Sequence, residues 1–148
     1  MAWWDRIGNE RMVSRATVAL AAITTDIFTV AGGRIILTHI VGNVTTIVGG
    51  AANVSLTTDP LVGTAGAVAL CTALDINGYD VGDLLGITGV PTDAMVPPVA
   101  GGAIVAPTMR MIIQTGTIDF VCDAAPGGAV QWEVWYIPLD DGASVVAA

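Results

Sequence analysis

Side chains with catalytic chemistry are few in this sequence, and they form no familiar constellation. His39 is the single histidine, so a Ser-His-Asp or Cys-His site would have to be built around it. It stands inside the apolar run Arg34-Ile35-Ile36-Leu37-Thr38-His39-Ile40-Val41, with no nucleophile motif beside it. We interpret His39 as a strand residue, and we expect no catalytic residues and no enzyme activity.

Metal and cofactor sites have little support either. Asp75, Asp80 and Asp83 surround an Asn-Gly turn and offer oxygen ligands, but they lack the regular spacing and distal glutamate of an EF-hand loop. Cys71 and Cys122 have no CxxC pair and no nearby histidine, so we interpret them as small buried side chains, with a disulfide as the alternative. Without any lysine, the chain also lacks a phosphate-binding Gly-Lys-Ser/Thr loop. We expect no metal and no cofactor.

The composition favours a structural role. The 148 residues are 53% hydrophobic and only 12% charged, with a mean hydropathy of +0.72, whereas an ordinary soluble domain is about 25% charged. The chain nevertheless contains no apolar run of the roughly 18 residues that a membrane helix needs, so a membrane is not an expected partner. With so few ionic groups to cover a monomer, we expect much of the surface to be buried against other protein chains.

Charge is distributed unevenly along the chain. The formal net charge is −8, from 13 acidic residues and 5 arginines, and Arg6, Arg11 and Arg15 all lie near the start. The remaining acidic body is a poor partner for nucleic acid, because phosphate binding needs clustered cations. A basic protein surface is the natural counterpart, although acidity can also serve only to keep an apolar protein soluble.

The hydrophobic pattern from about residue 17 is typical of strands. Short runs rich in Val, Ile, Ala and Thr are broken by glycine or proline, which favours strands joined by tight turns. We predict an all-β domain over residues 17–148, an antiparallel β-sandwich or jelly roll, or a distorted barrel, of about 8–10 short strands.

Within this domain the glycine pairs predict hairpins. Runs over 23–30, 34–41, 44–48 and 53–58 are expected to form an antiparallel meander, with turns that include Gly42-Asn43. Further strands are expected over 66–74 and 81–88. Residues 116–123 and 130–137, which flank Ala124-Ala125-Pro126-Gly127-Gly128, are predicted to pair as a hairpin with a longer loop.

Residues 1–16 differ from the rest and are predicted to form an N-terminal arm. They contain Trp3, Trp4, Arg6, Arg11 and Arg15. Adjacent tryptophans are costly in water and are enriched as interface anchors, so we expect the arm to bind a neighbouring subunit; folding back onto its own domain is the alternative.

Two further positions are candidate contacts. Residues 91–108 are rich in proline, glycine and alanine, which predicts a long loop, and Pro97 and Pro98 are its candidate contact residues. In the last long strand, Trp135 shares a mixed face with Gln131 and Glu133, as at the rim of an interface.

Three stretches resemble small virion structural proteins of tailed double-stranded DNA bacteriophages. They are FTVAGGRIILTHIVGNVTT (residues 28–46), LCTALDINGYDVGDLLGITG (residues 70–89) and the ending GTIDFVCDAAPGGAVQWEVWYIPLDDGASVVAA (residues 116–148). The resemblance implies a capsid-associated role without catalysis, and it does not identify functional residues in this sequence. We expect a decoration or cement protein on the capsid exterior, made in the host cytoplasm, that forms a homotrimer and stabilises the lattice of the major capsid protein.

Two other functions stay open at this point. The chain could instead belong to a head-fibre base, a neck or a tail, which the sequence does not separate from a head protein. A carbohydrate-binding β-sandwich would need exposed aromatic side chains, and only four Trp, two Tyr and two Phe are available.

Overall fold

The protein is a β-sandwich, in a computed structural model that describes residues 10–64 and 66–148. The described residues form twelve strands and no helix, which confirms the predicted all-β class. The strands are β1 (Arg11–Ser14), β2 (Val18–Ala19), β3 (Thr24–Ala31), β4 (Ile35–Thr46), β5 (Asn53–Pro60), β6 (Val68–Ala69), β7 (Leu74–Asp75), β8 (Leu84–Leu85), β9 (Met111–Ile113), β10 (Gly116–Cys122), β11 (Ala129–Pro138) and β12 (Ser144–Ala147).

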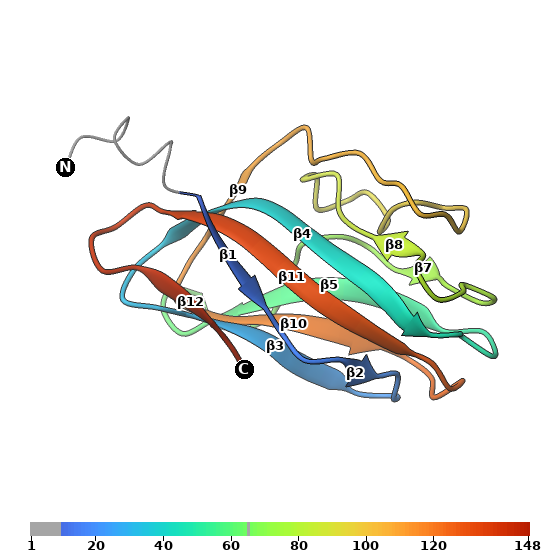
Figure 1. The fold of residues 1–148 in the computed structure, drawn as a ribbon. Coiled ribbons are helices and arrows are strands. Elements are labelled where there is room, and N and C mark those ends of the chain that lie inside the picture. Colours follow the sequence, from blue (N-terminus) through green and yellow to red (C-terminus); the bar gives the residue numbers. More distant parts are fainter. Residues whose placement is uncertain (1–9, 65) are drawn as a thin grey trace.

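Two six-stranded sheets make up the sandwich (Figure 1). The first, here the β11 sheet, has the order β1-β11-β4-β8, with β2 also beside β11 and β9 beside β4. The second, the β10 sheet, has the order β12-β3-β10-β5-β6, with β7 also beside β5. All these strands pair antiparallel.

The core lies between the two sheets, where the long strands turn alternate apolar side chains inward, apart from positions beside β-bulges. In β11 the residues Val130, Trp132 and Val134 are fully buried. Trp132 packs against Phe120 of the opposite sheet, with ring centroids 5.2 Å apart. This aromatic pair joins the two layers near their centre.

β3, β4 and β5 alternate between the sheets, as do β10 and β11, which corrects the predicted meander and hairpin. β3 and β5 lie in the β10 sheet whereas β4 between them lies in the β11 sheet, and β10 and β11 pair with different partners and not with each other. Both strands of the predicted hairpin carry a strongly apolar face, and each buries that face against the other sheet. The loop over residues 123–128 is long enough to cross the roughly 10 Å between packed sheets.

Gly42-Asn43 is not a turn, contrary to the sequence prediction, because β4 runs through both residues. Gly42 pairs with Trp132 on one side and Leu85 on the other. A Cβ atom at Gly42 would lie 2.9 Å from the Trp132 ring. Glycine is therefore used here for the close approach of a buried indole.

The region between β5 and β9 is mostly loop. In place of the predicted strands over 66–74 and 81–88, the structure has only the two-residue strands β6, β7 and β8, because few backbone groups of these segments pair with a neighbouring strand. Residues 91–108 contain no named strand, in line with the loop predicted there. These segments lie beside β4 and β5 at one side of the sandwich (Figure 1).

Candidate interaction surfaces

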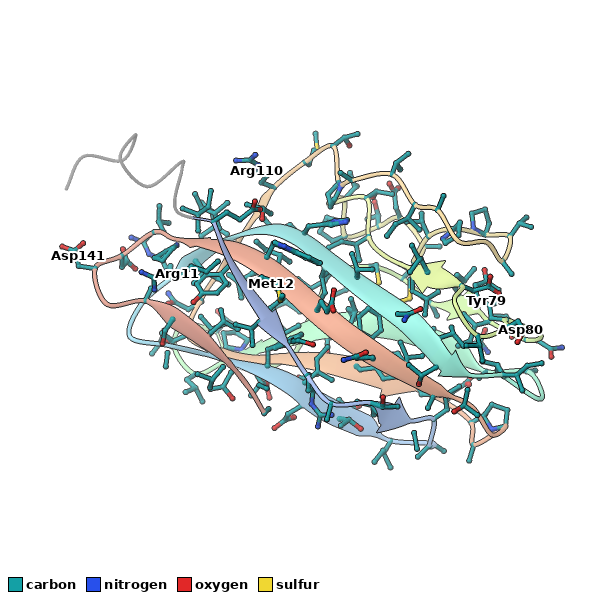
Figure 2. All side chains as sticks on the ribbon, viewed as in Figure 1. Arg11, Met12, Tyr79, Asp80, Arg110 and Asp141 are labelled. Atoms are coloured by element: carbon teal, nitrogen blue, oxygen red, sulfur yellow. The ribbon has the colours of Figure 1, made fainter. Side chains whose placement is uncertain are left out.

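The predicted arm residues fall partly outside the described part of the chain. Trp3, Trp4 and Arg6 lie outside the described residues. Arg11 is exposed on β1 (Figure 2), which pairs with β11 as an edge strand, so residues 11–14 of the predicted arm are part of the sandwich. Arg15 follows that strand, and its Nε donates to the carbonyl oxygen of Ala148 at 3.1 Å. Arg15 thus ties the start of the sandwich to the C-terminal residue.

Hydrogen bonds from Tyr79 and from the backbone of Gly86 hold the loop with Pro97 and Pro98. The hydroxyl of Tyr79 donates to the carbonyl oxygen of Pro97 at 2.6 Å, and burial raises the pKa of that tyrosine, with Asp83 and Asp75 acting in the same direction. Pro97 is half-buried whereas Pro98 is exposed. Tyr79 and Asp80 mark this end of the molecule, opposite the turn that carries Asp141 (Figure 2). Pro98 is thus the more accessible of the two predicted contact residues.

An apolar strip crosses the outer face of the β11 sheet. Trp135 on β11 is half-buried; its register partners are Met12 on β1 and His39 on β4. The rings of His39 and Trp135 are 5.6 Å apart between centroids. Two residues of the strip are strongly exposed, Met12 at 53% and Ile112 at 62%, and Ile112 on β9 pairs with the half-buried Ile36 on β4. Val41, two positions after His39 on β4, is half-buried on the same face. We call these six residues, Met12, Ile36, His39, Val41, Ile112 and Trp135, the apolar strip.

His39 lies in this strip beside Trp135. Burial lowers the pKa of its imidazole, and the carboxylate of Glu10 opposes that change. Glu10 itself accepts a hydrogen bond from the hydroxyl of Thr38. Within the described residues, His39 Nδ1 is buried and has no hydrogen-bond partner. The neutral ring therefore acts mainly as an aromatic neighbour of Trp135.

The outer face of the β10 sheet has the opposite character. Thr29, Thr117 and Asp59 form one row across β3, β10 and β5, because they are register partners. The neighbouring row consists of Asp26, Asp119 and Thr57. Hydroxyls and carboxylates therefore dominate this face, whereas the outer face of the β11 sheet combines the apolar strip with polar residues such as Gln131, Glu133 and Asn43.

Asp119 is the most unusual residue on that second face. It is only 4% exposed. Burial raises the pKa of its carboxyl, the Thr117 hydroxyl opposes this, and the like charges of Asp26 and Asp59 reinforce it. Among the described residues, its Oδ1 is buried without a hydrogen-bond partner, as is Thr57 Oγ1. An unpaired buried acceptor costs roughly 1–3 kcal/mol, so this arrangement calls for a ligand or a proton.

Sequence reasoning missed this acidic row, although the pattern carries a signal. In residues 116–122, the polar Thr117 and Asp119 alternate with the apolar Ile118, Phe120 and Cys122, so the alternation predicts that Thr117 and Asp119 share the outward face of the strand. The convergence of Asp26 with Asp119 is not readable, because it depends on β3 pairing with β10 across most of the chain.

The other side chains that could ligate a metal or react have structural roles. Asp75 Oδ1 accepts from the backbone N–H of Ala52 and of Asn77, so it stabilises a turn. Cys71 and Cys122 are buried and unpaired, and burial raises the pKa of Cys71 to about 11. Over residues 10–64 and 66–148, no three His, Cys, Asp or Glu side chains are grouped as metal ligands.

Searches for a membrane-spanning helix among the described residues and for similar proteins gave no match. In the part of the chain that the structure describes, no helix is long and apolar enough to cross a membrane. No family model, curated protein or solved structure matches the chain.

Proposed function

We propose that this chain is a virion structural protein of a tailed bacteriophage, a decoration or cement protein that binds the outside of the capsid as a homotrimer and stabilises the lattice of the major capsid protein. The observation that carries the proposal is the contrast between the two outer faces of one small sandwich. One face presents the apolar strip and the other presents threonines and aspartates. A protein with two such faces is suited to join unlike surfaces.

The apolar strip supports self-association. Met12 and Ile112 are more than half exposed. Met12 is the register partner of the large half-buried Trp135, and Ile112 lies beside Ile36 at the other side of the strip. Contiguous apolar patches rimmed by polar residues mark protein interfaces, and tryptophan and methionine are enriched in their cores. A second and a third copy of the chain would remove this strip from water.

The acidic face supports contact with a basic protein surface. Complementary charge raises the rate of encounter and excludes wrong partners. If the chain binds only the assembled lattice, that binding stabilises the assembled form by linkage, without any chemistry. The resemblance of the sequence to small phage virion proteins points to the capsid as the lattice.

The strand order also leads us to infer that the sandwich is a jelly roll. β3, β4 and β5 alternate between the sheets, and β10 later inserts between β3 and β5 while β11 inserts between β1 and β4. Two interleaved Greek keys of this kind define the jelly roll, which recurs in viral capsid proteins and also in lectins.

Binding to isolated virion parts tests the proposal. The purified chain is mixed with capsids that lack it and, separately, with isolated tails of the same phage, and each mixture is sedimented at low and high salt. We expect saturable binding to capsids that weakens with salt, because exposed charge pairs are screened. Binding to tails alone would favour a neck or tail component, and binding to neither would refute the proposal.

A further inference from the structure

The second row on the β10 sheet places three oxygen-bearing side chains side by side on adjacent strands. Asp119 on β10 is the register partner of Asp26 on β3 and of Thr57 on β5. Neighbouring strands lie about 4.8 Å apart, and side chains of directly opposed residues project to the same face. Asp26 is exposed, Thr57 is half-buried, and Asp119 between them is buried.

No cation lies beside this row among the described residues, and the hydrogen bonds of the Asp119 carboxyl are with the Thr117 hydroxyl and the Asp26 carboxyl. Asp119 Oδ1 and Thr57 Oγ1 are both buried without a hydrogen-bond partner. The described arginines are used or placed elsewhere: Arg34 pairs with Asp140, Arg15 bonds the Ala148 carbonyl, Arg11 lies on β1, and Arg110 lies on the loop before β9 (Figure 2). A buried carboxyl beside two other carboxyls needs either a cation or a proton.

We propose that Asp26, Asp119 and Thr57 form a binding site for the guanidinium group of an arginine on a protein partner. Guanidinium is a planar fork with five N–H donors, so it can bond two carboxylates and a hydroxyl at once, and it is less strongly hydrated than an ammonium ion. Thr117 and Val121 flank Asp119 on the same face of β10, where they can cover the aliphatic stem of the arginine.

The proposal deepens the proposed function, on which the identity of the partner rests, because it names the point where the acidic face would meet a basic capsid surface. Asp59, which is register partner of Thr117 in the next row, adds a third negative charge at the edge of the site. The exposed Asp26 provides the entry, and the buried Asp119 provides an acceptor oxygen that has no hydrogen-bond partner among the described residues.

Nuclear magnetic resonance with an arginine probe tests the site on the full chain. The probe is N-acetylarginine amide, and carboxyl carbon signals of aspartates are followed during titration at neutral pH and low salt. We expect saturable shifts at Asp26 and Asp119. The double variant Asp26→Asn/Asp119→Asn should weaken binding by about tenfold or more, because it removes both charged acceptors. Asp80→Asn is the matched control, since Asp80 is an exposed turn residue, and it should bind as the wild type does.

Three results would overturn the site. They are shifts that persist in the double variant, a proton shared by the two carboxyls with no response to the probe, and saturation of the same signals by Ca²⁺ and not by the probe. Thr57→Val provides a second variant that keeps both carboxyls and should weaken probe binding with an unchanged amide spectrum elsewhere.

Capsid binding separates the site from the proposed function. If Asp26→Asn/Asp119→Asn binds capsids as tightly as the wild type, the site is not the docking point although the function holds. If the probe binds at Asp119 and the chain ignores capsids, the site holds and the proposed function fails.

Discussion

Gly42→Ala tests the packing at the centre of the sandwich. Gly42 lies within β4 under the indole of Trp132, although the sequence favours a turn there. The added Cβ would lie 2.9 Å from two Trp132 ring carbons and 3.0 Å from Val130 Cγ1. Relaxed carbon contacts are about 3.5–4.0 Å, so the indole and Val130 must each retreat by several tenths of an ångström.

The expected loss of stability follows from two opposing terms. Overpacking a well-packed core costs about 1–3 kcal/mol. Replacing glycine by alanine recovers about 0.4–1 kcal/mol by restricting the unfolded chain. The net loss for Gly42→Ala should be about 0.5–2 kcal/mol, which for a domain of this size lowers Tm by roughly 2 to 8 °C.

Thermal unfolding followed by circular dichroism measures this loss, and Gly101→Ala is the matched control. At Gly101 the nearest atom to an added Cβ is Val99 O at 4.0 Å, so this variant should be neutral or slightly stabilised. The near-ultraviolet spectrum should change only in Gly42→Ala, because Trp132 packs against Phe120. Equal Tm values for the two variants would refute the placement of Trp132 over Gly42.

Three further predictions concern the surface. Burial, above all, raises the pKa of Asp119 from its ordinary 3.8, so the protonated carboxyl stabilises the fold fully below pH 3.8, and this contribution is lost as pH rises through the folded-state pKa. Asp119→Asn should therefore unfold at a higher denaturant concentration than the wild type at neutral pH. An unchanged pH dependence of stability in this variant would contradict the prediction. Ile112→Glu should dissociate the proposed homotrimer in analytical ultracentrifugation, because Ile112 is 62% exposed in the apolar strip, whereas Val81→Glu, at a 63% exposed loop position, should not; equal effects would argue against the strip. Asp140→Ala should lower Tm more than Arg34→Ala, because Asp140 accepts from the backbone N–H of Arg34 as well as from its guanidinium; a larger loss in Arg34→Ala would exclude this role.

Local pattern predicts the strands of this protein well and their partners poorly. The β-rich composition and the alternation in residues 130–137 correctly indicate all-β structure with Trp132 inside and Trp135 outside. Pairing fails because a short glycine-rich loop can either close a hairpin or cross between sheets. The choice depends on which apolar faces meet, and that is a property of the whole chain.

The same limit applies to the candidate surfaces. Trp135 is identifiable from alternation alone, whereas its neighbours Met12 and His39 come from strands far apart in the sequence. Asp119 looks like an ordinary outward aspartate until Asp26 and Thr57 are placed beside it. Gly42 shows the converse, since the Gly-Asn pair is a turn signal that the neighbouring indole overrides.

The number of copies of this chain per purified virion tests the central claim most directly. Quantitative electrophoresis against the major capsid protein gives that number. A decoration protein that follows the capsid lattice should be present in hundreds of copies, in a fixed ratio to the major capsid protein. A ring-like count of six or twelve, or absence of the chain from the particle, would contradict the account.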